Sequence, residues 1–247
     1  MMQNTMQNRL VRKKPIGLLC LVAVLVAFVP FRLEAAQTSA SDSASLKQVL
    51  AQMDAASVHF HEAYAHFNAD LYTAIVEQHE AQIGQIAVRR QGKSVEIGTL
   101  ITSQGGLKTD RQLLFKDGRF YYYEPNLKQE TIYPASKSYE GFLSLGFGGS
   151  GQQLCEHWQV SLEGFEKIDG VEVARLNLVP KSAEVRNNFS HILLWVDPQR
   201  ALAYKQKIFM PSGDTRTVVF DGMRYNQPVP SSMFTIHTAP GTKKIVK

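Results

Sequence analysis

Hydrophobic and polar residues alternate along neighbouring stretches of the C-terminal half, which predicts a three-stranded meander. Its first two strands are residues 191–196 and 204–209, and residues 216–220 form the third. The stretch Asp197-Pro198-Gln199-Arg200 has the composition of a β-turn, because proline presets φ at the second position and aspartate accepts a backbone hydrogen bond at the first. Three adjacent strands need more sheet on either side to be stable.

The same alternation predicts further strands upstream and one short strand at the end of the chain. The clearest hairpin surrounds Asp117-Gly118, a dipeptide that favours tight turns between apolar runs. For residues 60–76 a helix remains the alternative, since alanine is frequent there. The predicted strands outside the meander are 60–76, 81–89, 94–102, 112–115, 120–123, 128–133, 159–164, 172–179 and 234–237.

Three short helices interrupt this pattern. Ser45 can cap a helix that ends near Ala56, since its apolar residues recur at helical spacing. Residues 139–145 and 152–158 are the other two, and a glycine-rich stretch, 146–151, forms a flexible connector between them.

The order of elements predicts a mainly β fold. We expect about ten to eleven of these strands to form one antiparallel sheet, which is large enough to curl. Three amphipathic helices are too few to cover both faces, so we expect all of them on the concave side as a lid over an apolar cavity. Candidate cavity and lid residues are aromatic or aliphatic: Phe67, Leu71, Tyr122, Phe142, Leu145, Phe147, Trp195 and Phe220. Ordinary core packing is the alternative role for most of them.

The N-terminus has the pattern of a secretory signal peptide. Four basic residues between positions 9 and 14 precede an apolar run, 16–29, and Ala35-Ala36 offers a cleavage region. A membrane-spanning helix is the alternative, but it needs about 20 apolar residues. The expected organisation is therefore a signal peptide at 1–36, a flexible leader at 37–44 and one domain at 45–247.

Cleavage changes what the charge implies. The whole chain has a net charge of +5, but five basic residues and one acidic residue lie in 1–36, so the mature chain carries only +1. This balance argues against a nucleic-acid partner. The mature chain keeps only Cys155, so an intramolecular disulfide is excluded and an exported protein must depend on its apolar core.

The sequence contains no complete catalytic or metal-binding constellation. A nucleophile elbow, a P-loop and an H-E-x-x-H motif are all missing. His59, His61 and His66 could begin a zinc site, but no further ligand pair completes it, and a solvated strand end is the preferred interpretation. Cys155 lacks a base with suitable placement. We therefore expect no enzyme activity, no metal and no cofactor.

Several short stretches, in their order along the chain, resemble the LolA family of periplasmic lipoprotein carriers. These stretches are 116–118, 120–125, 194–198, 213–217 and 230–235. The resemblance extends from the helix at Leu46 to Gly241. It implies an unclosed β-barrel with a helical lid over an apolar cavity.

The resemblance also implies a function. Such a carrier binds the acyl chains of lipoproteins, receives them from an inner-membrane lipoprotein-releasing transporter and passes them to an outer-membrane acceptor. The localisation would be the periplasm, and the protein would act as a monomer. An apolar cavity is suited to this function. Burial of one CH₂ group contributes about 0.8 kcal/mol, so acyl chains need to be shielded from water while they cross an aqueous compartment.

By position, Arg90 corresponds to the family's arginine that holds the lid closed and is needed for release. Gln91 stands where the family usually has proline, and Ala87 where it often has tryptophan. A solvated arginine at a strand end is the alternative role. An alternative function for the whole protein is an envelope sensor of lipid or lipoprotein, or an interaction module that signals to a membrane partner. An envelope enzyme acting on lipids is the third and least favoured alternative.

Overall fold

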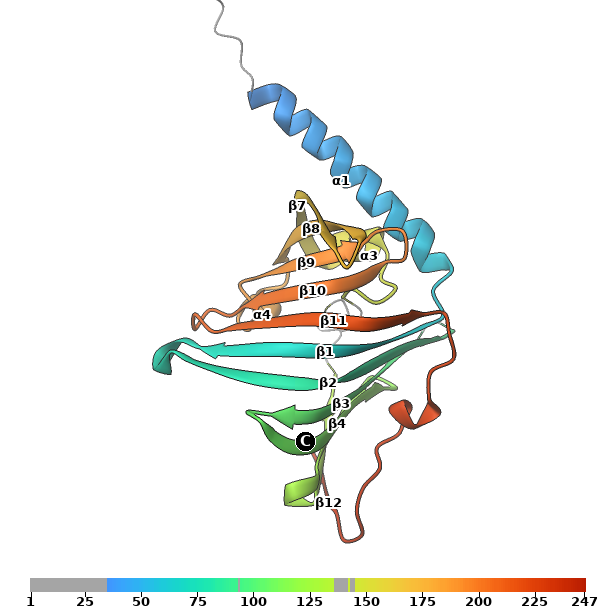
Figure 1. Cartoon of the computed structure of the whole chain (residues 1–247), viewed down its shortest axis with the longest axis vertical. Helices are drawn as coiled ribbons and strands as arrows, with labels where there is room; N and C mark the ends of the chain where they lie inside the picture. The colour runs from blue at the N-terminus through green and yellow to red at the C-terminus, as the bar shows by residue number, and fades with distance from the viewer. Residues whose placement is uncertain (1–34, 93, 136–141, 143–144) are drawn as a thin grey trace, which may run out of the picture. The chain divides into compact units, whose positions relative to one another are not determined.

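The computed structural model describes residues 35–92, 94–135, 142 and 145–247 (Figure 1). The predicted signal peptide, 1–36, lies outside this part apart from its last two residues. The predicted helix at 139–145 also lies outside it, except for Phe142 and Leu145. Both therefore stay predictions.

All twelve strands of the described ranges belong to one sheet. Their order is β12-β6-β5-β4-β3-β2-β1-β11-β10-β9-β8-β7, and every neighbouring pair is antiparallel except β12 with β6. Because β7 and β12 lie at opposite edges, the sheet is unclosed, as predicted. The strands are β1 (Glu62–Thr73), β2 (Gln78–Gln91), β3 (Ser94–Gln104), β4 (Leu107–Lys116), β5 (Arg119–Glu124), β6 (Gln129–Pro134), β7 (Trp158–Ile168), β8 (Val171–Pro180), β9 (His191–Asp197), β10 (Leu202–Phe209), β11 (Thr215–Tyr225) and β12 (Lys243–Val246).

Three α-helices lie within the described ranges: α1 (Ala35–Val58), α3 (Gly151–His157) and α4 (Ala183–Arg186). Short 3₁₀ turns are η1 (Ala74–Val76), η2 (Pro125–Leu127) and η4 (Ser231–Phe234). Helix α1 begins ten residues before the predicted cap Ser45, and so its backbone includes the stretch 37–44, for which we predicted a flexible leader. The flexibility of this stretch stays a prediction. Within the described part of the chain, no helix has the length and apolarity needed to span a membrane.

Strand β1 occupies the centre of the sheet and pairs with β2 and β11 over most of its length. The helical alternative for this stretch is therefore wrong. Ala63, Ala65, Phe67 and Ala69 are all buried, and all belong to the largest apolar cluster. Phe67 lies so close over β2 that a side chain at Gly84 would meet its ring at 2.6 Å. Alternation of period two thus places one apolar row on one face.

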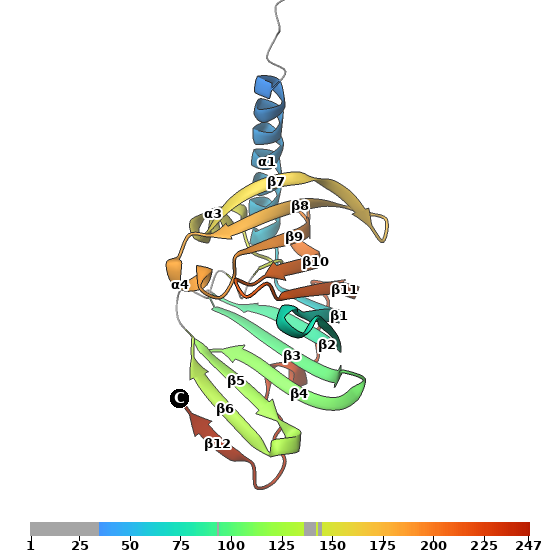
Figure 2. The same cartoon turned by 90° about the vertical axis from the view of Figure 1, so that its left-hand side faces the viewer.

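The face that carries this row is the concave one, and the helices pack on it. Val49 and Met53 of α1, Leu154 of α3 and Val185 of α4 join the same buried cluster as the apolar residues of β1 and β8–β11. Figure 2 shows α3 and α4 on the same side of the curved sheet. The expected arrangement, with the helices on one face, agrees with these contacts.

The opposite face is covered by the C-terminal segment. Here the predicted strand 234–237 is wrong, because the chain forms η4 and packs Phe234 against Tyr64, Ala87 and Leu114. Strand β3 carries Gly98 at this point, where a Cβ atom would lie 1.7 Å from a backbone oxygen. The backbone at Met233 packs against the face of the sheet, so it cannot at the same time pair edge to edge with a strand of that sheet. The chain then returns as β12, which we did not predict.

Candidate functional site

Arg90 lies near the end of β2 and links the lid to the sheet. Its Nη1 donates to the main-chain oxygen of Ser57 at 2.6 Å, and its Nη2 donates to that of Gly148 at 2.9 Å. Its guanidinium also lies 5.8 Å from the centre of the Phe60 ring. One side chain therefore joins the end of α1, the glycine-rich loop and the sheet. We call this set of contacts the Arg90 latch.

The α1 side of the latch is a favourable place for a cation. Ser57 is in the last turn of α1, where carbonyl groups have no partner within the helix and the helix dipole is negative. Arg90 satisfies one of these carbonyl groups. Since charge-assisted hydrogen bonds are roughly twice as strong as neutral ones, the latch stabilises this position of α1.

The loop side of the latch is held by close packing. Ala203 N–H donates to Gly146 O at 2.7 Å, and Gly148 N–H donates to Ala201 O at 2.9 Å. At Gly148, which has φ of 72°, an added Cβ atom would lie 2.3 Å from the Phe60 ring. The glycines therefore permit contact with β10 and Phe60. The prediction of a loose connector is wrong for this segment.

Helices α1 and α3 form one unit above the latch. Ser150 caps α3 and completes a capping box with Gln153. Asp54 of α1 accepts a hydrogen bond from the Gln152 backbone N–H at 2.9 Å. A pocket of about 560 Å³ lies beside the guanidinium, lined by residues that include Ser57, Gln152 and Arg90 itself. Its lining is too polar for an acyl chain.

Six of the eight predicted cavity residues come together under the lid. Leu145, Phe147, Phe67 and Phe220 are buried in the large apolar cluster, and Leu71 and Phe142 pack against it. Rings of Phe147 and Phe220 meet edge to face, with centroids 5.2 Å apart. The small pocket beside Met53, Leu145 and Leu154 has a volume of only about 10 Å³. At this point the described side chains of the lid and the sheet pack closely against each other.

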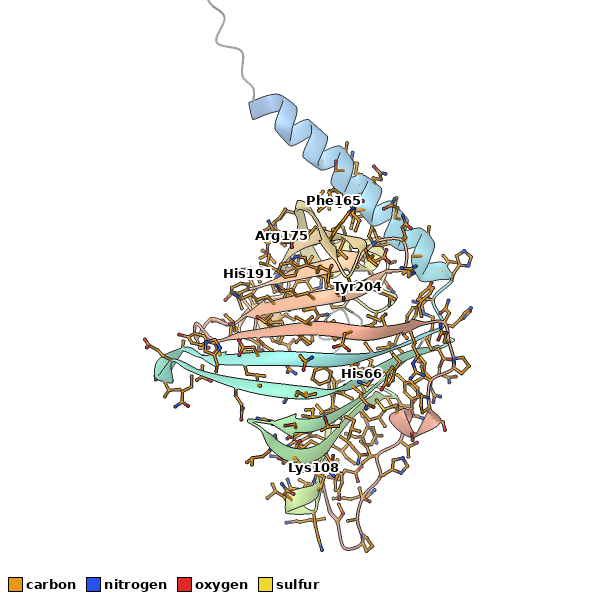
Figure 3. The ribbon with its side chains drawn as sticks, in the orientation of Figure 1. His66, Lys108, Phe165, Arg175, His191 and Tyr204 are labelled. Atoms are coloured by element: carbon orange, nitrogen blue, oxygen red, sulfur yellow. The ribbon has the colours of Figure 1, made fainter. Side chains whose placement is uncertain are left out.

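Trp195 does not belong to this group. Leu194 and Val196 point into the concave cluster, so the residue between them faces the other side. There Trp195 packs with Val173 and Tyr204, and the ammonium of Lys205 lies 4.6 Å from its ring centre. Figure 3 labels Tyr204 of β10, Arg175 of β8 and His191 of β9. Trp195 therefore does not line the cavity as we predicted, because alternate residues of a strand face opposite sides of the sheet.

Tyr122 lies on the concave side but away from the lid. It is opposite Leu113, which packs against the large cluster, and its hydroxyl donates to Glu124 Oε1 at 3.2 Å. Burial, together with the negative charge of Glu124, raises the pKa of Tyr122 above its usual value. Its phenol is therefore neutral at physiological pH and acts as a hydrogen-bond donor.

Groups suited to catalysis are sparse in the described ranges. Burial raises the pKa of the Cys155 thiol, so this residue is a poor nucleophile at neutral pH. Among the described residues, no group of three or more His, Cys, Asp or Glu side chains is placed to hold a metal ion. What the geometry does provide is an apolar face, a helical cover and a polar latch.

The sequence interpretation missed a polar cluster at the far end of the concave face. It contains Gln82, Gln104, Arg111 and Arg216, which a chain of hydrogen bonds connects. The signal was available for Arg216, because it alternates with Val218 and Phe220 on β11 and must share their face. Arg216 begins the predicted strand 216–220 and lies in the stretch 213–217 that marks the resemblance, but we assigned it no role in the site.

Comparison with known proteins shows similarity of fold without similarity of sequence. No family model and no curated protein matches the chain. An uncharacterized conserved protein from Thermus thermophilus superimposes with a TM-score of 0.53 at 10% identity, covering 82% of this chain and 99% of that one. MucB superimposes with a TM-score of 0.50 at 14% identity, covering 82% of this chain and 66% of that one.

A LolA superfamily protein from Nitrosomonas europaea aligns with 77% of this chain and 97% of its own at 14% identity, but with a TM-score of only 0.38. Identities this low describe the fold alone. The predicted fold class, a mainly β protein with an unclosed sheet and a small number of helices, is confirmed.

Proposed function

We propose that this protein is a periplasmic carrier that binds the acyl chains of lipoproteins and ferries them from the inner to the outer membrane. The observation that supports this function best is the Arg90 latch, which fastens a two-helix cover to an apolar sheet face. Since the helices of the cover pack directly on that face, a ligand that binds there must displace the cover. Binding and opening are then one event.

Arg90 would set the balance between holding and releasing the ligand. Its two hydrogen bonds stabilise the closed, empty form, so they oppose ligand binding by the same free energy. A carrier needs this opposition, because each buried CH₂ group of an acyl chain contributes about 0.8 kcal/mol to binding and several chains together would otherwise be released slowly. An inner-membrane transporter would supply the lipoprotein, and an outer-membrane acceptor would take it when the latch closes again. No catalytic step is part of this function.

The first test is native mass spectrometry of the protein purified from the periplasm, followed by identification of any acylated species. Transfer of a labelled lipoprotein between inner-membrane and outer-membrane vesicles tests the second half of the cycle. In Arg90→Leu the closed form loses two hydrogen bonds, so we expect tighter binding and release slowed at least tenfold.

The matched control is Arg224→Leu, since this arginine lies over the Tyr64 ring on the opposite face of the sheet. Its release rate should equal that of the wild type. An empty protein that also fails to take up added lipoprotein would contradict the carrier function, and so would unchanged release in Arg90→Leu.

A sensor or interaction module is the second candidate function. It is favoured by the likeness to MucB, which has also been solved in complex with MucA, and by the edge of strand β7, an outer strand of the described sheet where a partner strand could add. A pull-down that recovers a stable membrane partner, together with no transfer between vesicles, would favour this function over the carrier.

A further inference from the structure

The concave face changes from apolar to polar along the direction of β1. At the lid end Ala63 is opposite Val88, and both are fully buried in the apolar cluster. At the far end Ala69 is opposite Gln82, and Leu71 is opposite Arg216. A ligand that lies along this face would meet hydrocarbon first and then a group of polar side chains.

Arg216 is an uncompensated positive charge within this face. Its neighbours across the ladders are Leu71 and Ile208, which both belong to the apolar cluster or pack on it. Its Nη2 donates to the neutral Gln82 Oε1 at 2.8 Å, while its buried Nε has no hydrogen-bond partner. Among the described residues, no carboxylate forms an ion pair with it.

Burial lowers the pKa of Arg216, yet a guanidinium remains charged at any physiological pH. Placing such a charge on an apolar face without an opposite charge costs several kcal/mol in general. A purely structural role would be served better by a hydrophobic residue. The position is therefore explained by an anion that is present for part of the working cycle.

A second arginine faces the same region. Arg111 Nη1 donates to Gln104 Oε1 at 2.6 Å, and the same oxygen accepts a hydrogen bond from Gln82 Nε2 at 3.3 Å. Gln82 and Gln104 thus bridge the two guanidinium groups. Arg111 is about one third exposed, and its Nε lies 3.8 Å from Glu124, which leaves donors for a further acceptor. Glu80 accepts a hydrogen bond from Gln104 Nε2 at 2.7 Å, so Glu80 and Glu124 balance the formal charge of the two arginines. Among the described residues, neither carboxylate forms an ion pair with Arg216, whose Nε stays without a partner.

The length of the face accommodates both parts of an amphiphile. Nine residues of β1 separate its start beside the Arg90 latch from Leu71, which corresponds to about 30 Å of extended strand. One acyl chain spans half of a bilayer core, or about 15 Å. An acyl chain that lies along the half of this face nearer Leu71 can therefore place its polar end at Arg216, and the half beside the latch remains for further hydrocarbon.

The structure assigns to Arg216, Arg111 and Gln82 the role of a subsite for the anionic headgroup of an acylated ligand. This rests on the proposed function for its apolar half and narrows the ligand class to lipids or lipid-modified peptides with a carboxylate or phosphate next to the chain. The bidentate geometry of guanidinium groups suits both anions.

The test compares two probes that differ only in charge: pyrene-labelled hexadecanoic acid and its methyl ester. Fluorescence titration of the wild-type protein should give about tenfold tighter binding of the acid. In Arg216→Gln this preference should disappear, with binding of the ester unchanged. Lys205→Gln, on the opposite face, is the control and should keep the preference. Unfolding in urea checks that each variant is folded.

The possible outcomes distinguish failure of the proposed headgroup subsite from failure of the proposed carrier function. Equal binding of acid and ester by the wild type would overturn the subsite and leave the carrier function standing, whereas binding of neither probe would remove both. Hexadecyl phosphate should bind like the acid. If inorganic phosphate alone binds to the wild type and not to Arg216→Gln, while acid and ester bind equally, the site takes a free anion and the proposed headgroup role is wrong.

Discussion

Two guanidinium groups on one sheet face have opposite environments. Arg90 donates to two main-chain oxygens, one of them at the negative end of a helix. Arg216 donates to a single neutral amide and leaves Nε unpaired in an apolar surrounding. The first arrangement stabilises the closed protein, and the second costs stability that only a bound anion would restore. The two residues should therefore respond to the same substitution with opposite signs.

Replacing each arginine by methionine tests this contrast in the ligand-free protein. Arg90→Met loses two charge-assisted hydrogen bonds and should lower the free energy of unfolding by about 2 kcal/mol. Arg216→Met replaces an uncompensated charge by a side chain that suits Leu71 and Ile208, and should raise it by about 1 kcal/mol. Urea titrations measure both values. Similar destabilisation by both variants would mean that Arg216 is a structural residue.

Gly148 provides a second test at the scale of single residues. It combines φ of 72° with contact against the Phe60 ring, whereas Gly118 has φ of 68° and nothing within 4 Å of its missing Cβ atom. Gly118→Ala should cost only the backbone strain, about 1–2 kcal/mol. Gly148→Ala adds a steric conflict and should cost about 3 kcal/mol or more in urea unfolding. Equal losses would show that the loop moves aside without resistance.

At the scale of elements, the C-terminal segment is fastened by a charged cluster on the convex face. Arg89 pairs with Glu96 at 2.6 Å and lies 4.0 Å from the centre of the Phe234 ring, while Lys116 pairs with Glu96 at 3.1 Å. Glu96 is almost fully buried. It therefore holds two cations, one of which also packs on η4.

Glu96 should make stability depend on acid pH. Burial alone would raise its pKa, but the hydrogen bonds and charges of Arg89 and Lys116 outweigh this, and the pKa lies below the usual value of 4.5. Its contribution is complete above pH 4.5 and is lost as the pH falls through the lower, folded-state pKa. Unfolding in urea between pH 7 and pH 3 should show a smaller acid loss in Glu96→Gln. Glu172→Gln, at an exposed position, should behave like the wild type.

Local pattern predicted the elements whose partners are adjacent in the chain. The meander of β9 to β11 and the hairpin at Asp117-Gly118 were found because alternation and turn chemistry are local signals. Strand β12 was missed, since it pairs in parallel with a strand more than a hundred residues earlier and no hairpin turn announces it. In the site, Arg90 was found through resemblance. Arg216 was missed because the concave face is predicted from its apolar residues, and an arginine at one of these positions does not fit that pattern.

At the scale of the whole sheet, the two edges differ in the strand that ends them. Strand β7 is one outer strand, and β12 covers the other side by pairing with β6 (Figure 2). Lys243 N–H donates to Lys128 O at 2.8 Å, and Lys247 N–H donates to Ile132 O at 3.0 Å. An unprotected strand edge invites pairing with another chain, so β12 blocks association at β6.

Deletion of residues 243–247 tests this function of β12. It would expose the β6 edge and also remove Lys244, whose ammonium lies 2.9 Å from the buried carboxylate of Glu130. Water screens this ion pair because the Lys244 side chain is 65% exposed, but its loss leaves the buried carboxylate of Glu130 without a charged partner and should cost about 1–3 kcal/mol. We therefore expect a loss of stability in urea unfolding together with concentration-dependent association in sedimentation velocity. Ile245→Ala keeps the backbone pairing and should sediment like the wild type. If the protein without residues 243–247 associates no more than the wild type, the exposed backbone of β6 does not drive association. This result would contradict the proposed function of β12.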